Sequence, residues 1–180
     1  GYMAGIVNVG IAQNGIESTV PEAIPAAEFP KLKLFMEEAA QAQVEKDYIL
    51  LDKQSLSPGD YDKYLKIYPG LATVPLNKLN TTDKTEIAAL DAIFQQAIPM
   101  VAAIEQGGTP FTVIAQLPAE QLNQIRSAAA SQMSAVPAAA LKQYSIVYLS
   151  AQYKTVGLLS RMQSSYMWRI GALMLLLTLA

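Results

Sequence analysis

The chain contains no cysteine and no histidine among its 180 residues. Without cysteine it has no thiol nucleophile and no cysteine-based zinc site, and without histidine it has no imidazole base and no Ser-His-Asp triad. Only carboxylate, lysine, tyrosine or serine chemistry remains. The sequence therefore predicts that this segment is not an enzyme, and it indicates no catalytic residue, no cofactor-binding residue and no metal ligand.

Charge is also scarce. Charged residues make up 16% of the chain, and 13 Lys and Arg against 15 Asp and Glu give a formal charge of −2. A nucleic-acid-binding surface needs an excess of positive charge gathered on one face. This balance excludes nucleic acid as a partner.

Motifs for phosphate binding and for acid–base catalysis are missing as well. Residues 107–109 read Gly-Gly-Thr, but no Gly-Lys-Ser/Thr follows, so they do not form a phosphate loop. Asp60 and Asp62 are two positions apart, and side chains at that spacing do not face each other on a helix. We therefore expect no carboxylate pair there.

Uncharged, apolar stretches occupy both ends of the sequence. Residues 170–180 carry no charge, and Tyr166, Trp168 and Arg169 precede them, as is typical of a membrane interface. As a helix, this run would be only about 16 Å long, whereas a helix that spans a membrane needs roughly 20 residues, or about 30 Å. A buried core helix is the alternative. We expect residues 1–16 to end one transmembrane helix, residues 166–180 to begin a second, and residues 17–165 to form a domain between them.

Within that domain, a helix is predicted to begin at Ser57, with Pro58 at its first position, and to end at Pro69-Gly70. Tyr61, Tyr64 and Tyr68 follow at spacings of three and four. An aromatic ligand-binding cluster would show this spacing, but so would the packed face of any amphipathic helix. We favour packing.

A second helix is predicted from an N-cap at Thr82 or Asp83 to about Glu105, where Gln-Gly-Gly ends it. Glu86 is placed to complete a capping box with Asp83. Pro99 lies inside this helix and is expected to kink it. The predicted buried stripe consists of Ile87, Leu90, Ile93, Phe94 and Ile98.

Three further helices are expected: a short one over residues 32–43, one from Pro118 to about Met133, and a long one after Pro137. Because no proline follows Pro137, residues 138–180 are predicted to form one rod, roughly 65 Å long at 1.5 Å per residue. Such a rod would be a lever between the domain and the membrane, and a Gly157→Pro substitution would break it.

Strand patterns are few. Residues 48–52 and 74–79 are short apolar runs that would pair as a small hairpin. The predicted fold class is therefore mainly α, a helical domain with at most one small β-hairpin, flanked by two truncated transmembrane helices.

The amino-terminal residues carry a pattern in which Ile-Val-Asn and two Gly-Ile pairs precede a Val-Pro. Further stretches that carry the resemblance are residues 34–36, 48–57 and 64–69, and at the end of the chain Gln163, Tyr166 and the apolar run around Gly171. In these residues the chain resembles the segment between the first two transmembrane helices of bacterial ABC exporters of the multidrug type. The residues that carry the resemblance at the amino terminus are Ile6, Val7, Asn8, Gly10, Ile11, Gly15, Ile16, Val20, Pro21 and Ile24.

This resemblance implies an extracytoplasmic domain, at the bacterial cell membrane, that shapes the outward-facing opening of an ATP-driven multidrug, lipid or peptide exporter. It also implies membrane lipid at both ends and a second exporter half as partner, in a homodimer or a heterodimer. ATP and magnesium would bind only in cytoplasmic domains outside this segment. Residues 100–136 depart from the family pattern, so no residue role is carried over there.

Two other functions fit the same residues. One is the ectodomain of a two-helix membrane sensor or receptor, and the other is a soluble helical interaction scaffold whose apolar carboxy-terminal helix binds a partner. The sequence beyond Ala180 separates the first two. Several more spans followed by Gly-x-x-x-x-Gly-Lys-Ser/Thr would mark an exporter, whereas a coiled coil and a kinase would mark a sensor.

A first prediction concerns nucleotide. Purified segment 17–165 should neither bind nor hydrolyse ATP, because it has no phosphate loop and no histidine to orient a nucleotide. The measurements are equilibrium binding of a fluorescent ATP analogue and phosphate release with magnesium present. Turnover that persists after removal of contaminating ATPases would contradict the assignment.

Overall fold

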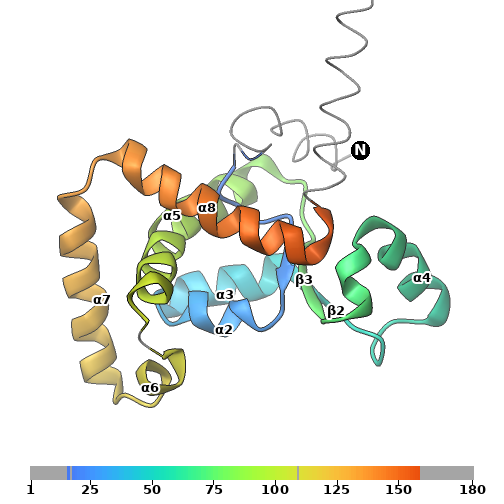
Figure 1. Cartoon of the computed structure of the whole chain (residues 1–180), viewed down its shortest axis with the longest axis horizontal. Helices are drawn as coiled ribbons and strands as arrows, with labels where there is room; N and C mark the ends of the chain where they lie inside the picture. The colour runs from blue at the N-terminus through green and yellow to red at the C-terminus, as the bar shows by residue number, and fades with distance from the viewer. Residues whose placement is uncertain (1–15, 17, 109, 159–180) are drawn as a thin grey trace, which may run out of the picture.

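The structure is a computed structural model that describes residue 16, residues 18–108 and residues 110–158. Helices account for 67% of the described residues, in seven α-helices, and a small three-stranded antiparallel sheet completes the fold. The mainly α fold class is therefore confirmed (Figure 1). The predicted membrane segments 1–16 and 166–180 lie outside the described residues, except Ile16, which is buried in the core.

The sheet is antiparallel and has the strand order β1-β3-β2, with β1 at Ala23–Pro25, β2 at Tyr48–Leu51 and β3 at Leu76–Leu79. The predicted pairing of residues 48–52 with 74–79 is confirmed, since Tyr48 lies opposite Leu79. The limit of two strands is wrong, because β1 adds a third. A three-residue strand ending in proline shows no alternation, and proline is tolerated there because β1 is an edge strand.

The single helix predicted over residues 32–43 is also wrong. The structure has α2 at Glu28–Lys33 and α3 at Glu38–Asp47, with a break between them. The side-chain amide of Gln41 donates to the carbonyl oxygens of Lys33 and Met36, at 3.1 and 3.0 Å. A side chain thus satisfies carbonyls that a continuous helix would have bonded through its backbone.

The helix predicted at Ser57 is confirmed as α4, Pro58–Ile67, and a 3₁₀ turn, η2, follows at Pro69–Ala72. The Ser57 hydroxyl accepts a hydrogen bond from the Asp60 amide at 3.2 Å. Tyr68 is fully buried, and Tyr61 and Tyr64 pack against the core. The tyrosines therefore form a packed face, as favoured.

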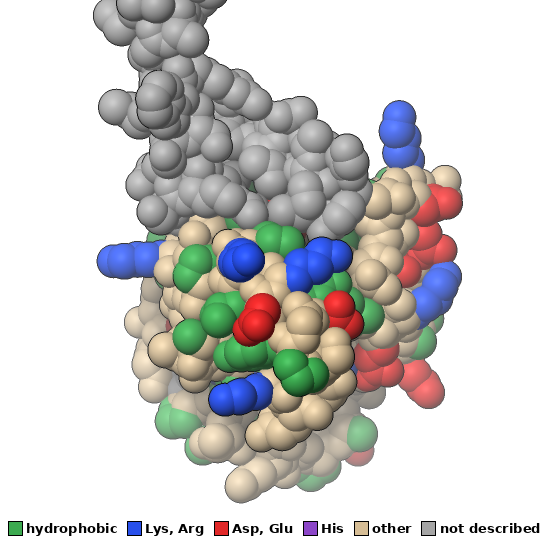
Figure 2. All heavy atoms as spheres, turned by 90° about the vertical axis from the view of Figure 1, so that its right-hand side faces the viewer, with side chains coloured by type: hydrophobic (Ala, Val, Ile, Leu, Met, Phe, Trp, Pro, Cys, Tyr) green, Lys and Arg blue, Asp and Glu red, His purple; other side chains and the backbone are tan. Residues whose placement is uncertain are grey.

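The surface around α4 mixes side chains of both charges with hydrophobic ones (Figure 2).

The longest helix, α5 at Lys84–Gly107, begins and ends as predicted. Asp83 caps it by accepting hydrogen bonds from the amides of Thr85 and Glu86, and Gly108 ends it with φ of 74°. The capping box does not form among the described contacts, since Glu86 pairs with Lys46 at 2.8 Å. Of the predicted stripe, Leu90, Phe94 and Ile98 are buried, and Ile87 and Ile93 are half-buried.

Among the described helices, α5 alone is long and apolar enough to cross a membrane by length and composition. It packs against α2, α3 and α8 inside the domain, and Leu90, Phe94 and Ile98 are fully buried there. These contacts are those of a core helix. Apolar length alone therefore does not mark α5 as a membrane span.

The remaining helices are α6 at Phe111–Ala115, α7 at Ala119–Ser134 and α8 at Ala138–Val156. The helix predicted after Pro118 is confirmed, whereas α6 was not expected.

The prediction of one continuous helix over residues 138–180 is wrong, because Gly157 adopts φ of 88° and ends α8. Left-handed φ breaks the helical hydrogen-bond pattern and is accessible to glycine because it lacks Cβ. The lever argument, and its Gly157→Pro test, no longer hold.

The end of α8 packs directly on the turn after α4. A Cβ atom added to Gly70 would lie 2.0 Å from the Thr155 carbonyl oxygen, and one added to Gly157 would lie 2.8 Å from Cδ of Pro69. Backbone therefore touches backbone at this contact. The η2 turn holds the carboxy-terminal end of α8 against the core.

This contact gives a second prediction. Gly70→Ala should lower the free energy of unfolding by about 1–3 kcal/mol, because backbone must shift to admit the methyl group. Gly59→Ala, at the start of α4, is the matched control, since nothing lies within 4 Å of its added Cβ. It should leave stability unchanged or slightly higher. Urea unfolding followed by circular dichroism measures both, and equal stability of the two variants would contradict the packing described.

Candidate functional site

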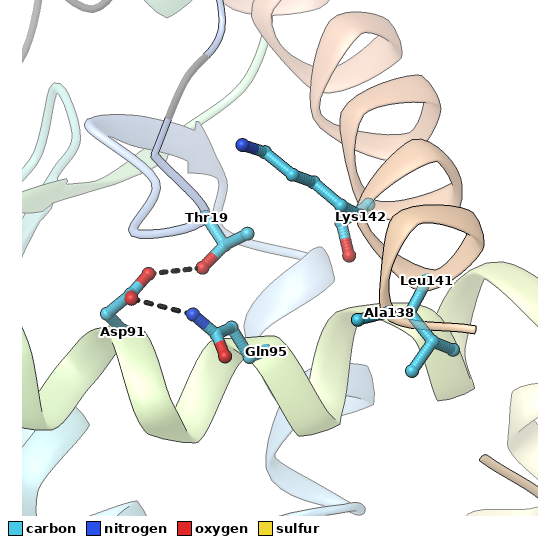
Figure 3. A pocket seen from close by; sticks show the side chains of 7 residues that line it. Thr19, Asp91, Gln95, Ala138, Leu141 and Lys142 are labelled. Atoms are coloured by element: carbon cyan, nitrogen blue, oxygen red, sulfur yellow. Dashed lines mark hydrogen bonds between the residues drawn. The ribbon is translucent and has the colours of Figure 1, made fainter. Parts of the chain in front are cut away.

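A pocket of about 390 Å³ lies between the segment that enters β1, the helix α5 and the start of α8 (Figure 3). Its volume falls within the range of small-molecule sites. The sequence had indicated no site residue, so every member of its lining was missed. The lining consists of Thr19, Asp91, Gln95, Ala138, Leu141, Lys142 and Ser145.

One wall of the pocket carries the carboxylate of Asp91. The Thr19 hydroxyl donates to Oδ1 of Asp91 at 2.6 Å, and the side-chain amide of Gln95 donates to Oδ2 at 2.7 Å. Gln95 follows Asp91 by four positions, so both side chains share one face of α5. These two donors fix the orientation of the carboxylate, and each oxygen keeps further acceptor capacity.

The opposite wall comes from the first two turns of α8. Ala138, Leu141, Lys142 and Ser145 have helical spacings of three, four and seven, which place them on one face. Ser145 is 1% exposed, whereas Lys142 is exposed. Lys142 extends from α8 over the side of the pocket on which Thr19 lies (Figure 3). Within the described part of the chain it forms no ion pair.

The polar groups of the pocket are two hydroxyls, one amide, one carboxylate and one ammonium. Its hydroxyls, Thr19 and Ser145, have no histidine beside them, because the chain has none. Asp91 accepts the proton of Thr19 in a hydrogen bond, but Thr19 is 7% exposed and lies at the edge of the core. Among the described residues, no group of three or more potential metal-ligating side chains lies together. One fixed carboxylate, one ammonium and an apolar wall are the features it offers.

A second polar cluster, outside the pocket, joins α2, α5 and α8 around Glu28. The Tyr148 hydroxyl donates to Oε1 of Glu28 at 2.8 Å, and Lys31 donates to Oε2 at 2.7 Å and also pairs with Glu105 at 3.3 Å. Burial raises the pKa of Tyr148, and the charge of Glu28 adds to the rise. Burial also raises the pKa of Glu105, again with a contribution from Glu28. Glu28 is thus a structural carboxylate.

A third cluster joins the entry of the domain to its exit. Glu22 is 1% exposed, and its Oε2 accepts a hydrogen bond from the Tyr68 hydroxyl at 2.8 Å. The Glu22 amide donates to the Tyr153 hydroxyl at 3.0 Å, across 131 positions of sequence. The Tyr48 hydroxyl donates to the Pro21 carbonyl at 2.6 Å. Burial raises the pKa of Tyr153 and of Tyr48, so both stay protonated at any physiological pH.

The Glu28 cluster gives a third prediction. Tyr148→Phe should lower the free energy of unfolding by about 1–3 kcal/mol, since it leaves a buried carboxylate oxygen without its donor. Tyr144→Phe, on the exposed face of the same helix, is the matched control and should change stability by no more than about 0.5 kcal/mol. Thermal unfolding of both variants measures the difference. Equal midpoints would show that Glu28 does not depend on Tyr148.

No family model matches the chain, no curated protein matches it, and no solved structure matches it. The function is therefore inferred from the sequence and from the geometry of the described residues.

Proposed function

We propose that this chain is the extracytoplasmic domain of an ATP-driven ABC exporter of the bacterial cell membrane, inserted between its first two transmembrane helices. The observation that carries the proposal is that the first and last described elements, β1 and α8, lie side by side. The amide of Glu22, beside β1, donates to the hydroxyl of Tyr153, near the end of α8. Two positions far apart in the sequence are thereby side by side in space.

The packing around that hydrogen bond supports the same proposal. The strand β1 packs against α8, and Ile16, Val20, Val156 and Leu158 all belong to the buried core. In a domain inserted between two neighbouring membrane helices, the first and last residues must lie close together, since packed helices lie about 8–10 Å apart. The geometry of this domain meets that requirement.

The proposed role is to cover and shape the outward-facing opening of the exporter. Because α8 is fixed to β1 and to η2, the domain would move as one body with both of its membrane connections. ATP and magnesium would act in the cytoplasmic domains, and a second exporter half would complete the transport pathway. Membrane lipid would contact the segments on either side of the domain.

The pocket favours a second candidate, the ectodomain of a two-helix membrane sensor. The two ends of an ectodomain between two membrane helices also lie close together. The pocket would be the site at which such a sensor binds its signal molecule. Sequencing the gene beyond Ala180 separates the two candidates. A phosphate-loop motif after further spans supports the exporter, and a kinase domain after a coiled coil supports the sensor.

A fourth prediction tests the side of the membrane on which the domain lies. In the full-length protein, with any cysteines elsewhere replaced, Ala128→Cys on the exposed face of α7 should react with a membrane-impermeant maleimide in intact cells or spheroplasts. The reason is that an extracytoplasmic, exposed thiol meets the reagent directly. Ala97→Cys, fully buried on α5, is the matched control and should react only after denaturation.

Reaction of Ala128→Cys only after cell lysis would place the domain in the cytoplasm and overturn the proposal. Reaction of both variants in intact cells would instead show that the core around Ala97 is open to solvent.

A further inference from the structure

The pocket between α5 and α8 presents two opposite charges that are not paired with each other. Asp91 accepts hydrogen bonds from Thr19 and Gln95, and Lys142 forms no ion pair within the described residues. We propose that this pocket binds a free, zwitterionic amino acid with an apolar side chain. Its ammonium group would lie at Asp91, its carboxylate at Lys142, and its side chain against Ala138 and Leu141.

The ammonium end of such a ligand needs several acceptors at once. The carboxylate of Asp91 is already oriented by two donors, so it does not have to reorganise when a ligand arrives. Gln95 and Ser145 line the same pocket, and each of these side chains has an oxygen that can accept a hydrogen bond. A preorganised carboxylate with neutral acceptors beside it is the usual surrounding of an amine.

The carboxylate end needs a cation, and among the described residues that line the pocket Lys142 is the one cation. Its side chain reaches over the pocket from α8 while Asp91 faces the pocket from α5 (Figure 3). The two charged groups therefore approach the pocket from different helices. A ligand that carries both charges can bridge the helices, which neither a simple anion nor a simple cation can do.

Charge balance selects among the small molecules that fit. A ligand with only a negative charge would be attracted by Lys142 but repelled by Asp91, and a ligand with only a positive charge would face the reverse. Ala138 and Leu141 add an apolar wall that favours an aliphatic side chain. L-Leucine combines the two charges with such a side chain and is the probe of choice.

This inference is independent of the exporter proposal, since it depends only on the lining of the pocket. Cysteine labelling reports the side of the membrane without any ligand, and ligand binding reports the pocket on either side. The two proposals can therefore fail separately.

The test is isothermal titration calorimetry of the 180-residue chain in detergent micelles with three matched probes. They are L-leucine, isoamylamine, which lacks the carboxylate, and 4-methylpentanoate, which lacks the amine. Leucine should bind at least about tenfold more tightly than either analogue, because each lost charge removes a charge-assisted hydrogen bond. No binding of leucine, or equal binding of all three probes, overturns the proposal.

Substitutions in the pocket identify which end of the ligand each side chain holds. Asp91→Asn should weaken leucine binding about tenfold or more and abolish any binding of isoamylamine. Lys142→Gln should weaken leucine binding by a similar factor and abolish any binding of 4-methylpentanoate. Asp62→Asn on α4 and Lys154→Gln on α8 are exposed, matched controls that should leave leucine binding unchanged. Pocket variants that bind leucine as well as these controls do would contradict the assignment.

A blocking variant makes the result independent of charge effects on folding. Ala138 is exposed at the mouth of the pocket, so Ala138→Phe should fill the mouth without disturbing the core. It should abolish leucine binding while the thermal midpoint without ligand stays unchanged. Leucine binding that survives in this variant would place the amino acid elsewhere and overturn the proposal.

Discussion

The joint between the two ends of the domain is the constraint on which the rest of the structure depends. Glu22 bonds through its amide to Tyr153 and through its carboxylate to Tyr68, so one residue holds the entry strand, the exit helix and the turn after α4. The approach of Gly70 to Thr155 closes the same joint through backbone alone. With its end fixed there, α8 lies across α5 (Figure 1). The pocket forms where the start of α8 meets α5.

Two buried carboxylates, Glu22 and Glu28, connect elements that lie far apart in the sequence. Burying a charge is costly unless hydrogen bonds compensate for its lost hydration. Glu22 receives the hydroxyl of Tyr68, and Glu28 receives that of Tyr148 together with Lys31. In each case the tyrosine comes from an element distant in sequence. Such a bond requires both elements to be in place, so it specifies their arrangement more than it adds net stability.

Local signals in the sequence predicted the local structure well. The caps at Ser57 and Asp83 and the apolar stripe of α5 depend only on neighbouring residues, and the structure confirms them. Two of the errors have a different cause, because they depend on residues distant in sequence, whereas the break between α2 and α3 rests on the nearby hydrogen bonds of Gln41. β1 exists because β3 pairs with it, and Gly157 turns where Pro69 packs on it. The pocket forms where Thr19, Asp91 and Lys142 meet from three segments, and its local signal in the sequence was the pair Asp91 and Gln95, four positions apart on one face of α5.

The turn at Gly157 changes what the domain can do in the proposed exporter. A continuous rod would have passed the tilt of one membrane helix into the domain, but α8 ends at its joint with β1 and η2. Force from either membrane helix would then reach Glu22 and Tyr153 first. A hydrogen bond already joins these two residues, one before β1 and the other near the end of α8. In the proposed exporter, such a joint would resist separation of the two membrane helices and would transmit their common movement. The domain would therefore follow the movement that the two membrane helices make together. Thr19, which lines the pocket, lies close to Glu22 in the sequence and therefore beside that joint.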